Sequence, residues 1–354
     1  MPLNLMNTLR DRAGTINDSS ARSEGLHDSE IAALDRIDDP LLRKVDMPFV
    51  AVHYPLGFKI EITTNSEDVL AAAAESWRFF SPRPVVSSLR LRIGVTEKSS
   101  RACPPAPVFR ADRNLFSVVA DAENFAICDL SQGFAFAWVS HGALQHRSYF
   151  RYHFLEACGF ALLAASHVTP IHAASIERRG CGVLLCGDSG AGKSSLAFAC
   201  ARNGWTYTAD DASYLINGCK DPLVTGNSHQ IRFRPSAVEL FPELAGISVT
   251  PRAAGKPSLE LPITNFPHLQ TAADCQVDRI VFLNRKDHTQ PGLVPYSREL
   301  ALQWFWQAIS NSGGAHDVQE ASIRELLDLP IQELRYRDLD WAVRRLDTLA
   351  LEGK

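Results

Sequence analysis

The chain has 354 residues, of which 45% are apolar, so it can build one large or two medium-sized hydrophobic cores. A net charge of -4, a sequence pI near 6.3 and the lack of any lysine-rich or arginine-rich block argue against nucleic acid or a membrane as partner. The eight scattered cysteines form no C-x-x-C pair, and the amino terminus has no secretory apolar core. We therefore expect a soluble cytoplasmic protein with reduced thiols.

The first part of the sequence predicts a flexible arm followed by a small domain. Residues 1–46 are rich in Ser, Asp, Arg and Gly and offer few apolar anchors, so we expect a flexible arm there. Residues 47–146 then predict an α+β domain with a helix over 66–80. Its expected strands are 49–54, 58–63, 89–95, 108–111, 114–120, 124–130 and 133–139. No catalytic constellation is visible in this region, so elimination leaves partner recognition or assembly into a homo-oligomer.

A long helical run over 147–166 is expected to join this domain to the remainder, and residues 147–354 predict an α/β domain. Strands interleaved with helices indicate a mixed sheet flanked by helices. The expected strands are 171–176, 182–186, 206–209, 231–233, 259–261 and 280–283, and the expected helices are 193–202, 235–244, 298–309, 322–327 and 338–351.

The most informative motif follows the second of those strands. The apolar run that starts at Val183 ends in Gly187-x-x-x-x-Gly192-Lys193-Ser194 and opens onto a helical pattern, which is the strand-to-helix context of a P-loop. Glycines let main-chain amides converge on phosphate oxygens, and the helix adds its positive end. The predicted nucleotide-binding residues are Gly187, Asp188, Ser189, Gly190, Ala191, Gly192, Lys193, Ser194 and Ser195.

Individual side chains of this motif have distinct expected roles. Lys193 should reach the β and γ phosphates, and the Ser194 hydroxyl should bind Mg²⁺, a hard cation that prefers oxygen ligands. Asp188 is unusual, because a carboxylate beside phosphates repels them unless it turns outward. It can cap the loop or meet a second cation, and we assign it no catalytic role.

Two adjacent acids, Asp210 and Asp211, end the next expected strand. Neighbouring residues of an extended segment point to opposite faces, so the two carboxylates should divide the work. We expect one acid to hold the metal, directly or through water, and the other to accept the proton of an incoming hydroxyl. The alternative is that the pair simply ends a strand.

His172, upstream of the loop, is expected to lie beside it if the two strands form a hairpin. If Arg179-Gly180 is a two-residue turn, Arg178 pairs with Cys181, and the antiparallel register sets His172 opposite Gly187. A structural histidine in an apolar strand is the competing interpretation.

The three elements together resemble the catalytic domain of HPr kinase/phosphorylase. The resemblance rests on Ile171-His172, the run Gly-Asp-Ser-Gly-Ala-Gly-Lys-Ser at 187–194, and Ala209-Asp210-Asp211, and it covers residues 170–214 best. It implies a P-loop kinase-like fold and use of ATP and Mg²⁺ to phosphorylate a serine of a carrier protein. It further implies His172 at the active site, Lys193 on the phosphates, Ser194 on Mg²⁺ and Asp211 as proton acceptor.

The sequence also departs from that family. A family Glu followed by Ile-Arg-Gly-Leu-Gly corresponds to the segment from Gln230 to Pro235, so an amide replaces an acidic metal ligand. The glycines that shape the family's substrate and phosphorylase loop are also missing, which puts phosphorylase activity and the carrier-protein substrate in doubt. These departures indicate a divergent member of the family that the sequence resembles. Arg232, Arg234, Arg252 and Lys256 are candidates to neutralise charge on the transferred group, and Lys256 is preferred among them.

Three functions remain open at the level of sequence. The first is an ATP-dependent kinase acting on a serine or similar hydroxyl of a protein or peptide. The second is a regulatory ATP-binding module with little catalysis, for which Gln230 is the best hint. The third is a small-molecule kinase with the same core.

Overall fold

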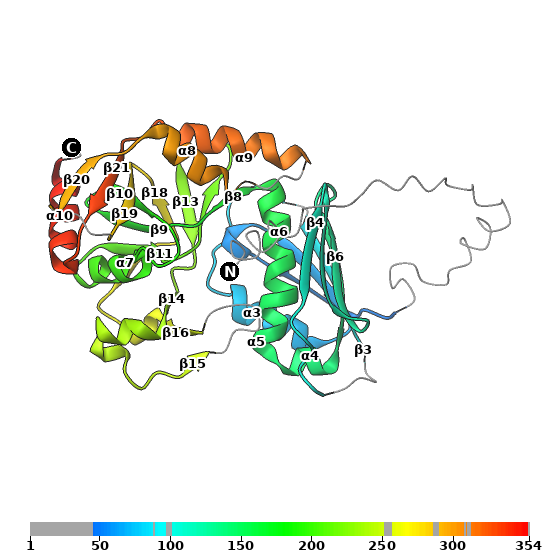
Figure 1. Ribbon diagram of the computed structural model, residues 1–354. Coiled ribbons are helices and arrows are strands. Elements are labelled where there is room, and N and C mark those ends of the chain that lie inside the picture. Colours follow the sequence, from blue (N-terminus) through cyan, green and yellow to red (C-terminus); the bar gives the residue numbers. More distant parts are fainter. Residues whose placement is uncertain are drawn as a thin grey trace, which may run out of the picture.

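The computed structural model describes residues 45–87, 89–96, 101–250, 257–285, 290–307, 309 and 313–352. The predicted arm of residues 1–46 lies outside this part of the chain except for its last two residues. The described chain has a mixed α/β architecture in two units that lie side by side (Figure 1). Among the described residues, no helix combines the length and the apolar character needed to span a membrane.

The first unit is a seven-stranded sheet in the order β1-β2-β3-β7-β6-β5-β4. Strands β2, β3 and β7 run parallel, and helix α3 (Glu67–Trp77) makes the crossover between β2 and β3. Alternating side chains such as Ile60 and Ile62 in β2 face the core, as period-two patterning requires. The strands are β1 (Phe49–His53), β2 (Ile60–Thr64), β3 (Leu89–Thr96), β4 (Val108–Asp112), β5 (Leu115–Asp121), β6 (Asn124–Asp129) and β7 (Phe134–Ser140).

A nearly continuous helix covers one face of this sheet. It consists of α4 (His141–Gln145), α5 (Arg147–Phe150), the π-helical stretch η2 (Arg151–Leu155) and α6 (Glu156–Ser166). Its apolar side chains Phe150, Phe154 and Leu162 are buried in the same hydrophobic cluster as the strands. The segment expected to join the two halves is therefore also part of the first core, and it lies between the units (Figure 1).

The second unit is built on a seven-stranded sheet in the order β17-β11-β9-β10-β19-β21-β20. Its central strand β10 (Cys181–Cys186) is fully buried and alternates between two cores. Val183 and Leu185 face helices α7 (Lys193–Arg202) and α10 (Leu339–Glu352), whereas Leu184 and Cys186 face α8 (Arg298–Trp306) and α9 (Gly313–Leu326). The other strands are β9 (Ala174–Arg178), β11 (Thr206–Ala209), β17 (Gln270–Thr271), β19 (Arg279–Asn284), β20 (Gly292–Pro295) and β21 (Ile331–Arg335).

Two smaller sheets complete this unit. One has the order β18-β13-β12-β8, and the other has the order β14-β16-β15. Their strands are β8 (Val168–Ile171), β12 (Ser213–Ile216), β13 (Leu223–Gly226), β14 (Gln230–Phe233), β15 (Val249–Thr250), β16 (Ser258–Pro262) and β18 (Asp274–Gln276).

Three sequence predictions of elements need correction. The expected strand 171–176 is the end of β8 and the start of β9, which lie in different sheets. The expected helix 235–244 is two 3₁₀ turns, η3 (Pro235–Glu239) and η4 (Pro242–Leu244), because Pro242 cannot donate to a continuing helix. The expected helix 322–327 is the last part of the longer helix α9.

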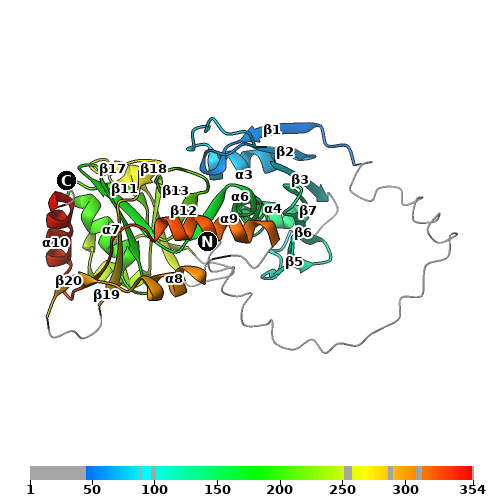
Figure 2. The same cartoon turned by 90° about the horizontal axis from the view of Figure 1, so that it is seen from above.

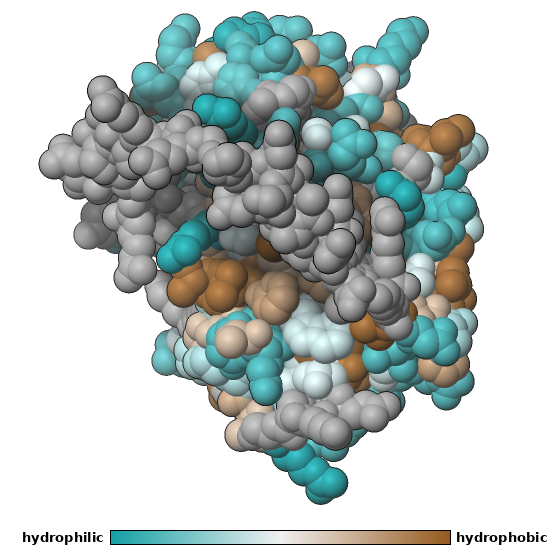
Figure 3. Space-filling view, turned by 90° about the vertical axis from the view of Figure 1, so that its right-hand side faces the viewer, coloured by the Kyte–Doolittle hydropathy of each residue, from teal (hydrophilic) through white to brown (hydrophobic). Residues whose placement is uncertain are grey.

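Specific contacts hold the two units together. Arg83 of the first unit forms an ion pair with Asp274, and Phe79 stacks on His229 with ring centroids 4.6 Å apart. Helix α9 lies against α6 where Gln319 Nε2 donates to the Ala164 carbonyl oxygen at 2.7 Å (Figure 2). Viewed from the side of the first unit, the described surface is mixed, with hydrophobic patches between hydrophilic ones (Figure 3).

Candidate nucleotide and phosphoryl-transfer site

The loop between β10 and α7 has the conformation that its glycines allow. Gly187, Gly190 and Gly192 have φ angles of 144°, 94° and 96°, a region that side chains with a Cβ rarely adopt. A Cβ on Gly192 would lie 3.1 Å from both Arg285 Cδ and the Tyr336 hydroxyl oxygen. The strand, loop and ten-residue helix follow one another as the motif requires.

Lys193 lies across this loop. Its Nζ donates to the carbonyl oxygens of Gly187 at 2.7 Å and Asp188 at 3.2 Å, and only 5% of the residue is exposed. Burial lowers the pKa of Lys193, and the nearby Asp211 carboxylate opposes that effect. The ammonium group is therefore held at the inner side of the loop.

Three further residues of the motif, Asp188, Ser194 and Ser195, have different surroundings. Ser194 Oγ donates to the Asp210 carbonyl oxygen at 3.4 Å, and Ser195 is half-buried in the first turn of α7. Asp188 Oδ1 accepts a hydrogen bond from Trp304 Nε1 at 3.3 Å. The sequence left two roles open for Asp188, capping the loop or meeting a second cation. In the structure this carboxylate turns outward instead and contacts helix α8.

Of the two candidate cations that lie in the described part of the chain, Arg234 is the one beside the loop. Its Nη2 donates to Ser189 Oγ at 2.7 Å, and its guanidinium nitrogens lie 3.8 and 3.9 Å from the position of a Cβ on Gly190. Arg232 lies elsewhere, half-buried, and its main-chain N–H donates to Asp210. Arg252 and the preferred candidate Lys256 fall outside the described residues.

The Asp210 carboxylate is buried at the end of β11. It is 8% exposed, and its Oδ2 accepts a hydrogen bond from the Arg232 main-chain N–H at 2.6 Å. Burial and the charge of Asp211 raise the pKa of Asp210 to about 6. This carboxylate therefore sits in an environment that disfavours its charge, which is a property of functional acids.

The Asp211 carboxylate turns to the other side and meets His172. The imidazole Nδ1 lies 3.3 Å from Asp211 Oδ1 and 3.1 Å from the Asp211 carbonyl oxygen. Burial lowers the pKa of His172, while Asp211 opposes the effect. For Asp211 itself, burial acts upward, but the attraction of His172, Lys193 and Arg232 outweighs it and lowers the pKa. The carboxylate is thus kept ionised.

The backbone explains how these residues meet. The hairpin register is as predicted, with Arg178 opposite Cys181 and Ala174 opposite Leu185. His172 lies where the chain passes from β8 to β9, and Asp211 lies where it passes from β11 to β12. The first passage leads from the small sheet to the large one, and the second leads from the large sheet to the small one. Because β8 pairs with β12, the two residues lie side by side.

Close packing fixes the acidic pair. A Cβ on Gly226, at the end of β13, would lie 2.5 Å from Ala209 Cβ and 3.2 Å from the carbonyl oxygens of Thr208 and Ala212. Only a residue without a side chain fits there, so Gly226 presses against the segment that carries the carboxylates.

Sequence reasoning missed several residues around the loop. Arg285 and Tyr336 follow β19 and β21, whose carboxyl ends meet the end of β10 at one edge of the sheet. Glu260 was also missed: its Oε2 lies 3.3 Å from Gln230 Nε2 and accepts a hydrogen bond from the Tyr152 hydroxyl at 2.6 Å. A carboxylate therefore lies beside the Gln230 amide, and only strand pairing, which sets Glu260 opposite Arg232, could have revealed it.

A metal site made of protein side chains alone is absent from the described residues, where no group of three or more His, Cys, Asp or Glu side chains is close enough to hold an ion. The donors at hand are the Ser194 hydroxyl and the Asp210 carboxylate. Oxygen donors of this kind fit Mg²⁺, which keeps several waters and takes further ligands from phosphates.

Comparison with known proteins gives little independent guidance. The sequence matches no family model and no curated protein. Among solved structures, the Hpr(Ser) kinase/phosphatase from Coxiella burnetii matches with a TM-score of 0.30 and 15% sequence identity, over 52% of this chain and 99% of that chain. A similarity at this level establishes neither a shared fold nor a shared function.

Proposed function

We propose that the chain is a cytoplasmic ATP-dependent kinase that transfers the γ-phosphoryl group to a serine or similar hydroxyl of a protein or peptide. One observation carries the proposal: His172 and Asp211 meet next to a glycine loop that holds a buried lysine. Phosphoryl transfer needs positioning and neutralisation of charge more than covalent chemistry, and these groups supply both.

The nucleotide half of the site follows from the loop. Main-chain amides of residues 187–192 and the start of α7 would bind the phosphates, and Lys193 would exchange its carbonyl partners for phosphate oxygens. Arg234, one hydrogen bond from Ser189, would take charge on the γ-phosphate. Ser194 and Asp210 would hold Mg²⁺, which when bound neutralises charge on the β and γ phosphates.

Asp211 is the proton acceptor in this proposal. The acceptor oxygen forms a bond to the γ-phosphorus while the bond from that phosphorus to the bridging oxygen of ADP breaks, and the hydroxyl proton passes to the Asp211 carboxylate. The lowered pKa makes Asp211 a weak base. A weak base suits phosphoryl transfer through a loose transition state, in which the attacking hydroxyl keeps its proton until the bond to phosphorus is largely formed. His172 fixes the carboxylate through its contact at 3.3 Å.

The second candidate is a regulatory ATP-binding module. It is favoured by Gln230, an amide where the resembling family has an acidic metal ligand, and opposed by Glu260, which brings a carboxylate within 3.3 Å of that amide. A small-molecule kinase would use the same nucleotide half and differ only in its acceptor.

The test combines γ-labelled ATP and Mg²⁺ with a lysate of the source cell, and compares wild type with Asp211→Asn and Lys193→Ala. A kinase labels a discrete species, and Asp211→Asn loses transfer by roughly 10²- to 10⁴-fold while ATP still binds. Lys193→Ala should lose ATP affinity.

The matched control is Asp340→Asn, which makes the same change at an exposed aspartate in the first turn of α10. If Asp211→Asn and Asp340→Asn transferred label equally well, the kinase proposal would be wrong and the regulatory module would be favoured.

A further inference from the structure

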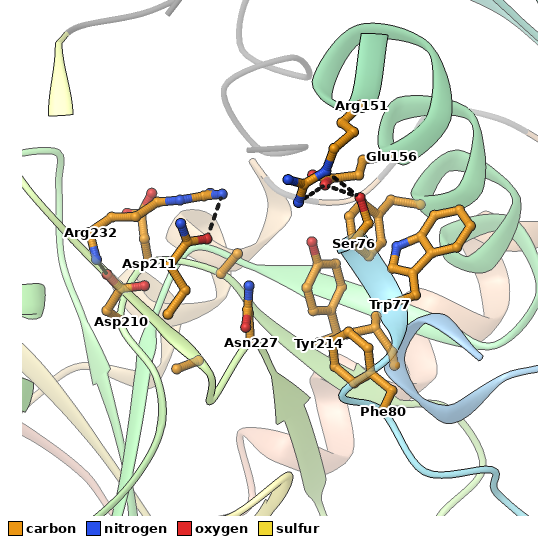
Figure 4. A pocket seen from close by; sticks show the side chains of 15 residues that line it. Ser76, Trp77, Phe80, Arg151, Glu156, Asp210, Asp211, Tyr214, Asn227 and Arg232 are labelled. Carbon is orange, nitrogen blue, oxygen red and sulfur yellow. Dashed lines mark hydrogen bonds and ion pairs between the residues drawn. The ribbon is translucent and has the colours of Figure 1, made fainter. Parts of the chain in front are cut away.

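A cavity of about 60 Å³ lies between the two units, directly beside Asp211. Its walls come from α3 and the long helix on one side (Figure 4). On the other side they come from residues at the end of β11, the start of β12, the turn after β13, and strand β14. Since one water requires roughly 10–15 Å³ of such space, the cavity can hold a group of about four to six heavy atoms. A ligand here would touch the proton acceptor without entering the glycine loop.

The wall from the first unit is a fixed polar cluster. Arg151 Nε donates to Ser76 Oγ at 2.7 Å, and Ser76 Oγ donates to Glu156 Oε1 at 2.8 Å. Arg151 Nη2 lies 3.3 Å from the same Glu156 oxygen, and its Nη1 lies 3.7 Å from Glu75 Oε2. The side chains of Arg151 and Glu156 are mostly buried, with 24% and 11% exposed. Arg151 also begins the π-helical stretch, a rare geometry that is frequent at functional sites.

The opposite wall carries Arg232, Tyr214 and Asn227. Figure 4 shows the guanidinium groups of Arg151 and Arg232 facing one another across the cavity, with the Tyr214 hydroxyl pointing into the same space. Arg232 is held by Gln230 Oε1 at 3.2 Å and Glu260 Oε1 at 3.4 Å, contacts that use only part of its five donors. Asn227 uses its Oδ1 to accept from the His229 N–H, which leaves its amide nitrogen as a donor.

The cavity therefore offers more hydrogen-bond donors than acceptors to a ligand. Glu156 is already engaged with Ser76 and Arg151, so the groups with unused capacity are mainly donors. Two carboxylates line the cavity next to the loop: Asp210, which accepts from the Arg232 main-chain N–H, and Asp211. A complementary ligand offers one hydroxyl to Asp211 and an oxygen-rich, planar anion to the two arginines. Carboxylates fit guanidinium groups in this way.

We propose that this cavity binds the phosphoryl acceptor, and that the acceptor carries a carboxylate close to its reacting hydroxyl. The inference rests on the proposed kinase activity and names its substrate class. Two sources supply this chemistry, a free hydroxy acid and a serine beside an acidic side chain in a peptide. The first unit then acts as the acceptor-binding half of the site.

The test measures phosphorylation by the full-length chain of paired probes that differ in the carboxylate. Glycolate is compared with ethylene glycol, and a peptide containing Asp-Ser-Asp is compared with one containing Asn-Ser-Asn. At least one carboxylate probe should show a kcat/KM at least roughly 10-fold above that of its uncharged partner, because a hydrogen bond to a charged group has about this effect. The pair that responds identifies the source.

Two variants assign the effect to the cavity. Arg151→Gln keeps a side chain that can bond Ser76 and should raise the KM for the responding probe roughly 10- to 100-fold, with the dissociation constant of ATP unchanged. Tyr214→Phe removes only a hydroxyl and should raise the same KM by a smaller factor. The control is Arg147→Gln, one turn earlier on the same helix, which pairs with Asp68 and Glu75 and does not line the cavity.

The outcomes separate this inference from the proposed function. If ATP is consumed in a manner that depends on Lys193 but neither probe pair prefers the carboxylate, the acceptor assignment is wrong and the kinase proposal stands. The same holds if Arg151→Gln and Arg147→Gln have equal KM values. The inference is supported if Arg151→Gln loses the preference for the carboxylate probe while Arg147→Gln keeps it.

Discussion

Asp210 should make the ligand-free protein less stable at neutral pH than an uncharged residue in its place. Its pKa is about 6 in the folded chain, against an ordinary value of 3.8. A group whose pKa rises on folding binds its proton more tightly in the folded state, so the free energy of unfolding falls as pH rises from about 4 to about 7. Each pKa unit corresponds to about 1.36 kcal/mol, which gives at most about 3 kcal/mol for this carboxylate.

The perturbation is Asp210→Asn, since an amide can still accept the hydrogen bond that the Arg232 main-chain N–H donates at 2.6 Å. At pH 8 the variant should exceed wild type in free energy of unfolding by up to about 3 kcal/mol, and near pH 4 the two should agree. The assay is urea unfolding in EDTA at several pH values, followed by tryptophan fluorescence, to which the buried Trp205 contributes. Mg²⁺ with ATP should reverse the ranking, because a carboxylate binds the ion more tightly than an amide does.

Asp211→Asn provides a contrast of opposite sign at the neighbouring position. The pKa of Asp211 is lowered in the folded chain, so its charge stabilises the fold above the ordinary pKa and the variant should be less stable at pH 7. Parallel pH dependences of wild type and Asp210→Asn, or a loss of stability in Asp210→Asn at pH 8, would refute the argument from burial.

Two further substitutions test the geometry. Gly226→Ala places a Cβ 2.5 Å from Ala209 Cβ, so it should destabilise the fold by about 1–3 kcal/mol in urea unfolding and weaken Mg²⁺-dependent ATP binding. The control Gly292→Ala, whose Cβ would have its nearest atom at 3.8 Å, should have neither effect. If the two alanine variants behaved alike, the close packing at Gly226 would not be what fixes the acidic pair. Arg234→Gln should weaken ATP binding about 10-fold in calorimetric titration and have a smaller effect on AMP, since the lost charge acts on the outer phosphates; an unchanged ATP affinity would remove this arginine from the site.

Local patterns predicted the parts of the molecule in which sequence neighbours determine the structure. The β10 strand and helix α7 are where the glycine motif and the apolar run put them, and the turn at Arg179-Gly180 fixed the hairpin register correctly. Both turn residues have positive φ, at 55° and 76°, as a type I′ turn requires. The position of His172 does not follow from that register, which ends at Ala174 opposite Leu185. His172 lies beside Asp211 because β8 pairs with β12.

Long-range pairing accounts for what the sequence did not predict. Strands β12 and β13 were not expected, and they carry Tyr214 and Gly226 to the acidic pair. Glu260 reaches Gln230 only because β16 pairs with β14 across a segment of about thirty residues. The cavity itself joins side chains such as Ser76 and Asp211 that are far apart in the chain, and no local pattern encodes such a meeting.

The long helix bears on how the protein can be dissected. Phe150, Phe154 and Leu162 are completely buried against the strands of the first sheet, although this segment directly precedes β8 of the second unit. A fragment ending at residue 146 would leave that sheet without its cover and would tend to aggregate, whereas one ending near residue 166 would retain it. Fragments of the second unit that begin at residue 147 would display the same apolar stripe to water, so separate expression of the two halves should divide the chain after the helix.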